Sequence, residues 1–227
     1  MNLQVQEHQE LPDIEGAWKK YKRGRIKQFP QNNLRASSVG HPCDRYHYYC
    51  IKNWRERPLH NEVLQSIFDE GNLQERSVIQ SLQEMGFEVI NQQRSFQLDN
   101  PLITGHVDGI LRWKEHDFPF DVKSISPHDF PKLVSAEDFL YSKKLHQRNY
   151  IAQLQIYLLI TNNPIGCLIT KNKLTGQPKV IWTQQETVTL ILKEFFIKQN
   201  GHENLCTSCY QCNRSKSNKL LSEWGDC

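Results

Sequence analysis

The chain has 227 residues, of which 38% are hydrophobic and 23% charged, and its formal net charge is +3. A chain of this length and composition can bury a core, which excludes a disordered protein and favours a single globular domain. No apolar run approaches the ~18 residues needed to cross a bilayer, and the first residues lack the basic-then-apolar pattern of a signal peptide. We therefore expect a cytoplasmic protein without membrane partners.

The first part of the chain is rich in basic residues. Segment 19–27, KKYKRGRIK, holds six basic residues and no acidic one. Such a segment is typical of a surface that contacts phosphates, and equally of a solvated helix face. We expect residues 1–34 to form a basic arm or helix, followed by a single domain over 35–212 and a short tail over 213–227.

Two helices are expected before the first strand. Segment 35–50, RASSVGHPCDRYHYYC, predicts a capped turn into a short helix that carries Cys43. From Glu62 to Met85 the apolar residues recur at helical spacing, with Gly71 interrupting the pattern and Gly86 ending it.

Three β-prone segments follow, at 87–98, 103–113 and 118–125. They are rich in branched and aromatic residues and are separated by polar turns, which predicts three consecutive strands that form a meander.

The second half of the chain returns to helical patterns. A connection with a weak helical centre spans 126–146, and the apolar segment 148–161 predicts a helix ended by Asn-Asn-Pro. Residues 166–182 predict a hairpin that turns at 174–177, and 187–199 a last helix. This order of elements predicts an α/β fold in which helices flank a mixed sheet.

Two acidic residues fall inside apolar, β-prone segments: Asp108 in GHVDG and Asp121 in FPFDVKSI. Strand alternation puts Asp121 and Lys123 on one face, while Phe120 and Val122 point the other way. An ionised side chain inside an apolar run is costly unless it has a partner or a metal. The alternatives are an ordinary surface ion pair for Asp121 with Lys123, and a turn in which Asp108 caps its own backbone.

Four sequence features occur in an order that resembles the PD-(D/E)xK nuclease superfamily, and within it the RecB-like exonucleases, including those of phages. They are a G-x-x-x-E element from Gly71 to Glu75, GHVD ending at Asp108, the D-x-K of Asp121 and Lys123, and a Q-x-x-x-Y element from Gln153 to Tyr157. The resemblance runs from about residue 35 to residue 212. It implies a restriction-endonuclease-like core and DNA as the substrate, either single-stranded or with free ends.

The carboxylates of this pattern suit phosphodiester hydrolysis. Glu75, Asp108 and Asp121 are hard oxygen ligands for Mg²⁺ or Mn²⁺, which neutralise the phosphate and acidify a bound water. By resemblance, the backbone carbonyl of Val122 is a further ligand. Lys123 can orient or deprotonate the attacking water. Many relatives have histidine at the position of Glu75, which leaves the choice of metal open.

Gln153 and Tyr157 are four residues apart and share a helical face. In the family that face contacts DNA near the site, so the resemblance implies that both residues bind the substrate. On an apolar helix outside this context, such a pair is more often partly buried structure.

The seven cysteines, without a signal peptide, favour metal binding over disulfides. Three of them, Cys206, Cys209 and Cys212, form a C-x2-C-x2-C run that needs one more ligand to complete a tetrahedral or cluster site. The candidates for the fourth ligand are Cys43, Cys50, Cys227 and His202.

Cys43 begins a C-x-R-x-x-x-Y element, CDRYHYY, that resembles the iron–sulfur branch of these nucleases. That branch includes the CRISPR-associated exonucleases and the nuclease domain of AddB, in which one N-terminal and three C-terminal cysteines hold a [4Fe–4S] cluster. The resemblance implies that Cys43, Cys206, Cys209 and Cys212 join the N- and C-terminal segments at such a site. The C-terminal spacing departs from the usual pattern, and Zn²⁺ bound by the three-cysteine run with Cys227 is the alternative.

Together these patterns predict a metal-dependent DNA exonuclease that acts in DNA recombination, repair, or CRISPR or phage DNA processing. Residues 19–27, Lys171 and Lys173 would contact phosphates. A catalytically silent DNA-binding or assembly subunit, working beside a helicase, recombinase or integrase, is the alternative. A third hypothesis is a zinc-stabilised protein whose motif matches are accidental. The intact D…D-x-K pattern favours the enzyme, because a pure binder has no need of clustered acids facing a polyanion.

Overall fold

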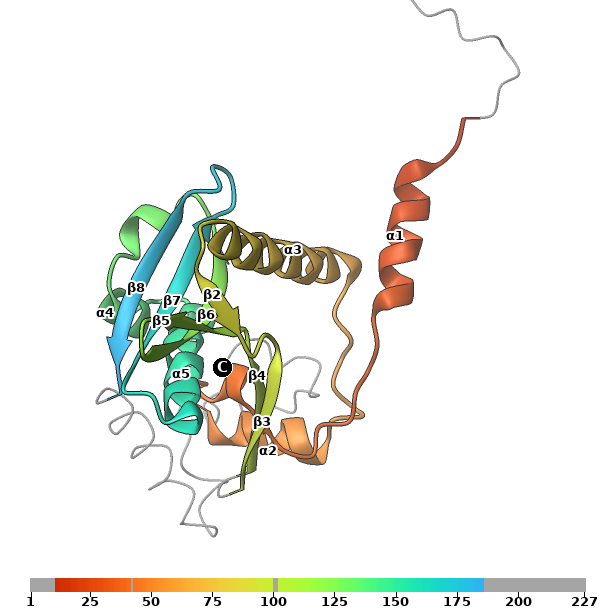
Figure 1. Ribbon diagram of the computed structural model, residues 1–227. Helices are drawn as coiled ribbons and strands as arrows, with labels where there is room; N and C mark the ends of the chain where they lie inside the picture. The colour runs from red at the N-terminus through yellow and green to blue at the C-terminus, as the bar shows by residue number, and fades with distance from the viewer. Residues whose placement is uncertain (1–10, 42, 100–101, 186–227) are drawn as a thin grey trace, which may run out of the picture.

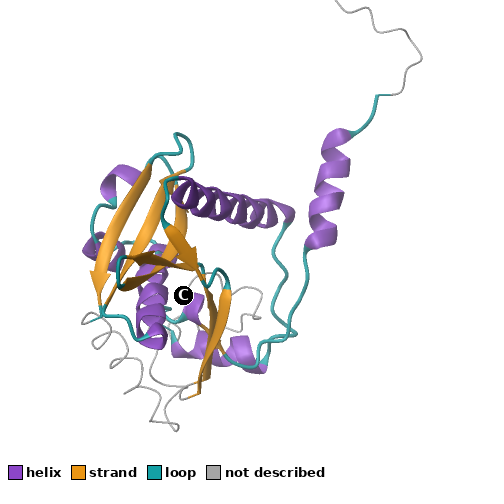
Figure 2. Ribbon diagram, viewed as in Figure 1, coloured by secondary structure: helices purple, strands orange, loops and turns teal. Residues whose placement is uncertain are grey.

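The computed structural model describes residues 11–41, 43–99 and 102–185 (Figures 1 and 2). The helices are α1 (Ile14–Arg25), α2 (Asp44–Lys52), α3 (Glu62–Glu84), α4 (Ala136–Leu140) and α5 (Leu145–Thr161). The strands are β1 (Leu34–Arg35), β2 (Glu88–Ile90), β3 (Arg94–Asp99), β4 (Leu102–Val107), β5 (Gly109–Trp113), β6 (His116–Ile125), β7 (Ile165–Asn172) and β8 (Pro178–Gln184). Within these ranges no helix is long and apolar enough to cross a membrane.

A five-stranded mixed sheet forms the centre, in the order β2-β5-β6-β7-β8. The pair β6–β7 is parallel and the other neighbours are antiparallel. Parallel neighbours need a crossover connection, and α5 lies in the crossover between β6 and β7. The predicted α/β architecture, a mixed sheet flanked by helices, is confirmed.

The two faces of this sheet are covered by different helices. Val78 and Ile79 of α3 pack with Phe120 and Val122 of β6 on one face, whereas α5 contributes Ile151 and other residues to the core on the other face. Alternate residues of β6 therefore point to opposite faces of the sheet, one covered by α3 and the other by α5, as the sequence predicts.

Helix α3 is long because its apolar face packs on the sheet. Its N-cap, Asn61, accepts a hydrogen bond from a first-turn N–H over 2.9 Å. At the other end Gly86 has a φ of 88°, and its N–H and that of the next residue bond back to carbonyls of the last turn. The predicted end at Gly86 is confirmed. The predicted interruption at Gly71 is wrong, because α3 continues unbroken for 23 residues and packing outweighs the low helix propensity of one glycine.

The predicted meander of three strands needs correction. Segments 87–98 and 103–113 are each divided in two. Strands β3 and β4 pair with each other in a separate three-stranded sheet, in which β4 also pairs with β1, while β2 and β5 remain in the central sheet.

The division occurs where the paired strands bend together. Residues 91–93 on one strand face only 108–109 on the other, because the flanking residues on either side remain paired. Asn91 and Gln93 have φ values of 52° and 53°. An extra residue of this kind bends a strand pair and redirects nearby side chains. Asp108 lies at this bend.

The basic segment forms most of α1, which is attached to α3 largely by charge. The pairs are Lys22–Asp69 (2.6 Å), Arg23–Glu62 (2.9 Å) and Arg25–Asp69 (3.2 Å). In Figure 1, α1 stands beside the N-terminal end of α3 and away from the central sheet. Much of its positive charge is thus compensated by α3.

The remaining predicted elements lie partly within the described residues and partly outside them. The apolar helix at 148–161 matches α5, which ends at Asn162 in the left-handed region with a φ of 52°. The hairpin at 166–182 matches β7 and β8. The helix at 187–199 and the cysteines from Cys206 onward lie outside the described residues, so these predictions remain open.

Gly109, next to the bend, tests the packing of the strand pair. A Cβ added there would lie 2.5 Å from Cζ of the fully buried Phe120. We expect Gly109→Ala to lower the free energy of unfolding by about 2 kcal/mol in urea denaturation. As a control, Gly24→Ala in α1 has no described atom within 4 Å of the new Cβ and should leave stability equal or higher. Unchanged stability of Gly109→Ala would contradict the close packing on Phe120.

Candidate active site

The carboxylate of Asp108 connects the bend to the neighbouring strand β6. The β5–β6 ladder ends with Gly109 opposite Phe120. Two residues further along β6, the N–H of Val122 donates to Asp108 Oδ2 over 2.9 Å, in a buried position. Asp108 is 8% exposed, and its carboxylate bonds across to β6.

Asp121 and Lys123 project from the same face of β6, as strand alternation predicts. Lys123 Nζ lies 3.0 Å from Asp121 Oδ1 and 2.7 Å from Oδ2. The Asp121 side chain is 0% exposed, against 20% for that of Lys123, which rules out the alternative of an ordinary surface ion pair. The ammonium of Lys123 therefore contacts both oxygens of the buried Asp121 carboxylate.

Helix α3 brings Glu75 to the same place from the other side of the bend. Glu75 Oε1 accepts a hydrogen bond from Gln93 Nε2 over 2.5 Å. Gln93 is one of the residues at the bend, and its N–H points to the carbonyl of Asp108 at 3.4 Å. Burial raises the pKa of Glu75, and the charge of Asp108 raises it further. The two carboxylates are thus within electrostatic range of each other.

Burial and like charge dominate the electrostatics of the site. Burial raises the pKa of Asp121 to about 8; Lys123 opposes this shift, whereas Asp108 and Glu75 add to it. Burial lowers the pKa of Lys123, but Asp121 and Asp108 outweigh this, so the net shift is upward. The ionised carboxylates of the site therefore favour the charged ammonium of Lys123. Of its two predicted roles, this favours orienting water and stabilising charge over deprotonating water.

Gln153 and Tyr157 of α5 complete the neighbourhood of Asp108. Tyr157 is 1% exposed, its hydroxyl donates to the carbonyl of His106 over 2.5 Å, and it accepts a hydrogen bond from Gln153 Nε2. Burial, with Asp121 and Asp108, raises the pKa of Tyr157. Tyr157 thus supports the end of β4 through its hydrogen bond to His106. The predicted contact of Gln153 and Tyr157 with DNA stays a prediction.

Two residues of the site were missed in the sequence. The ring of Tyr150 lies 5.3 Å from Lys123 Nζ. Tyr150 precedes Gln153 by three residues and Tyr157 by seven, and this helical spacing of polar and aromatic residues in an apolar segment was a usable signal. Gln93 gave no signal, because its contact with Glu75 depends on the bend.

The donor set of the site suits a hard divalent cation, because it consists of three carboxylates, of which that of Asp121 is fully buried. Within the described ranges, however, no three His, Cys, Asp or Glu side chains converge closely enough to form a metal site. Each carboxylate is instead held by a partner within the protein: Asp108 by Val122, Glu75 by Gln93 and Asp121 by Lys123. The ligand role of the Val122 carbonyl also remains a prediction.

Of the candidate ligands of the predicted cysteine site, Cys43 and the alternative Cys50 lie in the described residues, and both are buried. Cys43 is the N-cap residue of α2 and is 3% exposed, with its N–H donated to His41 Nδ1 over 3.1 Å. Its predicted partners Cys206, Cys209 and Cys212, and the alternative ligands Cys227 and His202, lie outside the described residues.

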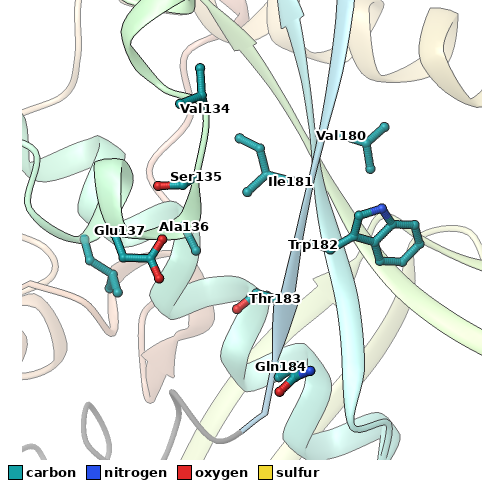
Figure 3. Close-up of a pocket in the computed structure, with 10 residues that line it drawn as sticks. Val134, Ser135, Ala136, Glu137, Val180, Ile181, Trp182, Thr183 and Gln184 are labelled. Atoms are coloured by element: carbon teal, nitrogen blue, oxygen red, sulfur yellow. The ribbon is translucent and has the colours of Figure 1, made fainter.

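A separate pocket of about 410 Å³ lies between α4 and β8. Figure 3 shows Ile181 and Thr183 pointing toward α4, with Val180 and Trp182 on the opposite side of the strand. Its one ionisable side chain is Glu137. None of the predicted site residues lines it, so it does not belong to the acidic site.

No family model matches the chain, and no curated protein matches it. Among solved structures, a protein called SSO0001 aligns with a TM-score of 0.44 and 15% identity, covering 83% of this chain and 88% of the other. The alkaline exonuclease LHK-Exo from Laribacter hongkongensis aligns with a TM-score of 0.43 and 14% identity, covering 83% and 98%. Its complex with dAMP gives 0.40 and 14%, with the same coverage. At these identities and TM-scores, the similarities by themselves define neither the family nor the activity of the chain.

The raised pKa of Asp121 predicts a pH-dependent stability of the metal-free protein. Between its ordinary value near 4 and its native value of about 8, Asp121 binds a proton in the native state that the unfolded chain releases. This contribution is therefore full at low pH and is lost as the pH rises through about 8. We expect the urea-unfolding free energy in EDTA to fall by about 1 kcal/mol per pH unit more steeply for wild type than for Asp121→Asn. Equal slopes would contradict the shift.

Proposed function

We propose that the protein is a divalent-metal-dependent nuclease that hydrolyses phosphodiester bonds in DNA. The observation that carries this proposal is the fully buried carboxylate of Asp121, which a single ammonium contacts although two further carboxylates lie nearby. Asp108 and Glu75 lie within electrostatic range of it. The single ammonium of Lys123 does not balance three carboxylates, and uncompensated buried charge is costly. A cation is the natural complement of such a cluster, and a phosphodiester is a natural substrate for that cation.

Each residue of the cluster has a role in this reaction. A divalent cation held by Glu75, Asp108, Asp121 and the carbonyl of Val122 would polarise the phosphate and supply an acidified water. Asp121 would hold the cation as an ionised carboxylate, with its proton released to solvent. The ammonium of Lys123, between Asp121 and the ring of Tyr150, binds the attacking water or a phosphate oxygen and stabilises the negative charge that develops.

Residues behind the cluster hold it in position. Tyr157 fixes the carbonyl of His106, two residues before Asp108, and thereby the end of β4. Gln93 orients Glu75 from the bend. Such supporting contacts matter because small displacements of catalytic groups have large effects on rate.

The order of the motifs in the sequence supports a more specific proposal about the mode of cleavage and the pathway. We propose that cleavage is exonucleolytic, on single-stranded DNA or from free ends, in recombination, repair, or CRISPR or phage DNA processing. A helicase, recombinase or integrase is the partner that this role implies. The alternative, a silent DNA-binding or assembly subunit, predicts binding without cleavage.

Cleavage of end-labelled linear DNA, single- and double-stranded, with Mg²⁺ or Mn²⁺ tests the nuclease. We expect Lys123→Ala to lower the cleavage rate by about 10²–10⁴-fold and Asp108→Asn to abolish measurable cleavage, both with DNA binding retained. Asp117→Asn is the matched control, because Asp117 also lies on β6 but pairs with Arg112 at the surface. It should cleave like wild type. If wild type binds DNA in the presence of metal and never cleaves it, the assembly-subunit hypothesis replaces the nuclease.

We further propose that Cys43, Cys206, Cys209 and Cys212 hold a structural [4Fe–4S] cluster, with Zn²⁺ as the alternative. Oxygen-free purification should yield a coloured protein with iron and acid-labile sulfide, and Cys43→Ser should lose both. Cys167→Ala should retain them, because Cys167 lies in the core beneath α3. Zinc in place of iron would support the alternative, and a protein with neither metal would contradict both.

A further inference from the structure

Strand β8 forms one edge of the central sheet, and this edge is long and uncharged. In the sheet order β2-β5-β6-β7-β8, β7 is the one strand among the described residues that pairs with β8. The opposite edge strand, β2, has three residues, whereas β8 has seven and pairs with β7 without a bulge. Residues 180–184 carry no charge. Proteins protect exposed edges with short strands, charges or bulges, so an edge without these features is suited to pairing with another strand.

The hydrogen bonds at the two ends of β8 show which of its backbone groups are free. The N–H of Gln185 donates to the carbonyl of Pro164 over 2.8 Å. The carbonyl of Gln177 accepts a hydrogen bond from the N–H of Asn172 over 2.9 Å. Because backbone groups alternate in direction along an antiparallel strand, the odd-numbered residues of β8 bond to β7. The even-numbered residues direct their backbone groups outward, and those with an outward N–H are Val180, Trp182 and Gln184.

Both faces of β8 have room for the side chains of a further strand. Val180 and Trp182 are 47% and 51% exposed on one face. On the other face, Ile181 and Thr183 point toward α4 across the pocket of about 410 Å³ (Figure 3). A strand added at this edge would place alternate side chains against Val180 and Trp182 and beside α4. The free backbone groups and both faces therefore fit an extended strand.

The segment that follows β8 in the chain does not fit this edge. Residues 187–199 are predicted to form a helix, and a helix satisfies its backbone hydrogen bonds internally. The edge therefore requires a strand from another molecule.

A second copy of β8 fits the edge in antiparallel orientation. About a twofold axis, the outward-directed residues of one strand pair with the outward-directed residues of the other. With Ile181 on the axis, Val180 of each copy lies opposite Trp182 of the other, and pairs of a β-branched with an aromatic side chain are favourable. Lys179, the nearest charged residue, falls opposite Thr183. No like charges therefore meet across the axis.

We propose that the outer edge of β8 is a dimerisation surface, at which β8 of a second copy continues the central sheet across a twofold axis. Backbone hydrogen bonds supply the affinity, and the pairs of Val180 with Trp182 fix the register. None of the residues of the acidic site lies on β8. The inference is therefore independent of the proposed nuclease function.

Sedimentation velocity of the full chain over a range of concentrations tests the dimer. We expect wild type to form a dimer, and Trp182→Lys to raise the dissociation constant about tenfold or more, because it removes two cross-strand pairs. Trp113→Lys is the matched control, since Trp113 is also 51% exposed and packs against an aromatic ring, that of Phe87, but lies on β5. It should dimerise like wild type.

Amide hydrogen exchange at single-residue resolution gives a second readout, for which wild type alone is sufficient. The outward amides of Val180 and Gln184 should exchange slowly in the dimer and about tenfold faster or more after dilution to the monomer. The amides of Ile181 and Thr183 bond to β7, so their protection should not change on dilution.

Every other outcome overturns the proposal. A monomer at all concentrations excludes the dimer; protected outward amides would then show that residues 186–227 cover the edge, and fast exchange would show that the edge is free. A dimer that Trp182→Lys leaves intact, or that Trp113→Lys disrupts, uses another surface. If Trp182→Lys does not fold, exchange in wild type decides, because outward amides whose exchange does not respond to dilution place the interface elsewhere.

Discussion

The hydrogen bond from the N–H of Val122 to the carboxylate of Asp108 sets the geometry on which the rest of the site depends. It forms where the β5–β6 ladder ends and where the bent strand pair leaves the central sheet. Because the side chain of Asp108 supplies the acceptor, β6 stays bonded while β4 turns away. The supporting contacts of Gln93 and Tyr157 converge on the same bend. The fold thereby brings a strand end, a helix face and a buried carboxylate to one point.

That convergence has an electrostatic cost. Three carboxylates with one ammonium are stable in the metal-free protein only because the proton distribution adjusts, and the raised pKa of Asp121 expresses this adjustment. Under the proposed nuclease function, a divalent cation would take the place of this proton. Lys123 supplies the ammonium that contacts the buried carboxylate.

Local periodicity decided which features could be predicted from the sequence. The shared face of Asp121 and Lys123, the apolar helix α5 and the end of α3 at Gly86 follow from spacing alone. The division of two β-prone segments could not be foreseen, because both read as continuous strands and bend only through pairing with distant partners. The burial of Tyr157 depends likewise on the tertiary fold. The interruption expected at Gly71 was wrong because packing of α3 on the sheet outweighs the low helix propensity of one glycine.

The attachment of α1 by ion pairs has a further consequence. Of the six cations in segment 19–27, Lys22, Arg23 and Arg25 already face carboxylates of α3. A cation that is already paired with a carboxylate neutralises phosphate less well and so releases fewer of the counterions condensed on a nucleic acid, and the slope of log K against log salt concentration counts those released counterions. That slope would therefore report fewer charges than the sequence contains. Ionic strength also weakens the more exposed pairs of Arg23 and Arg25, whereas the largely buried Lys22–Asp69 pair is screened less, so α1 keeps one firm contact with α3 as the salt concentration rises.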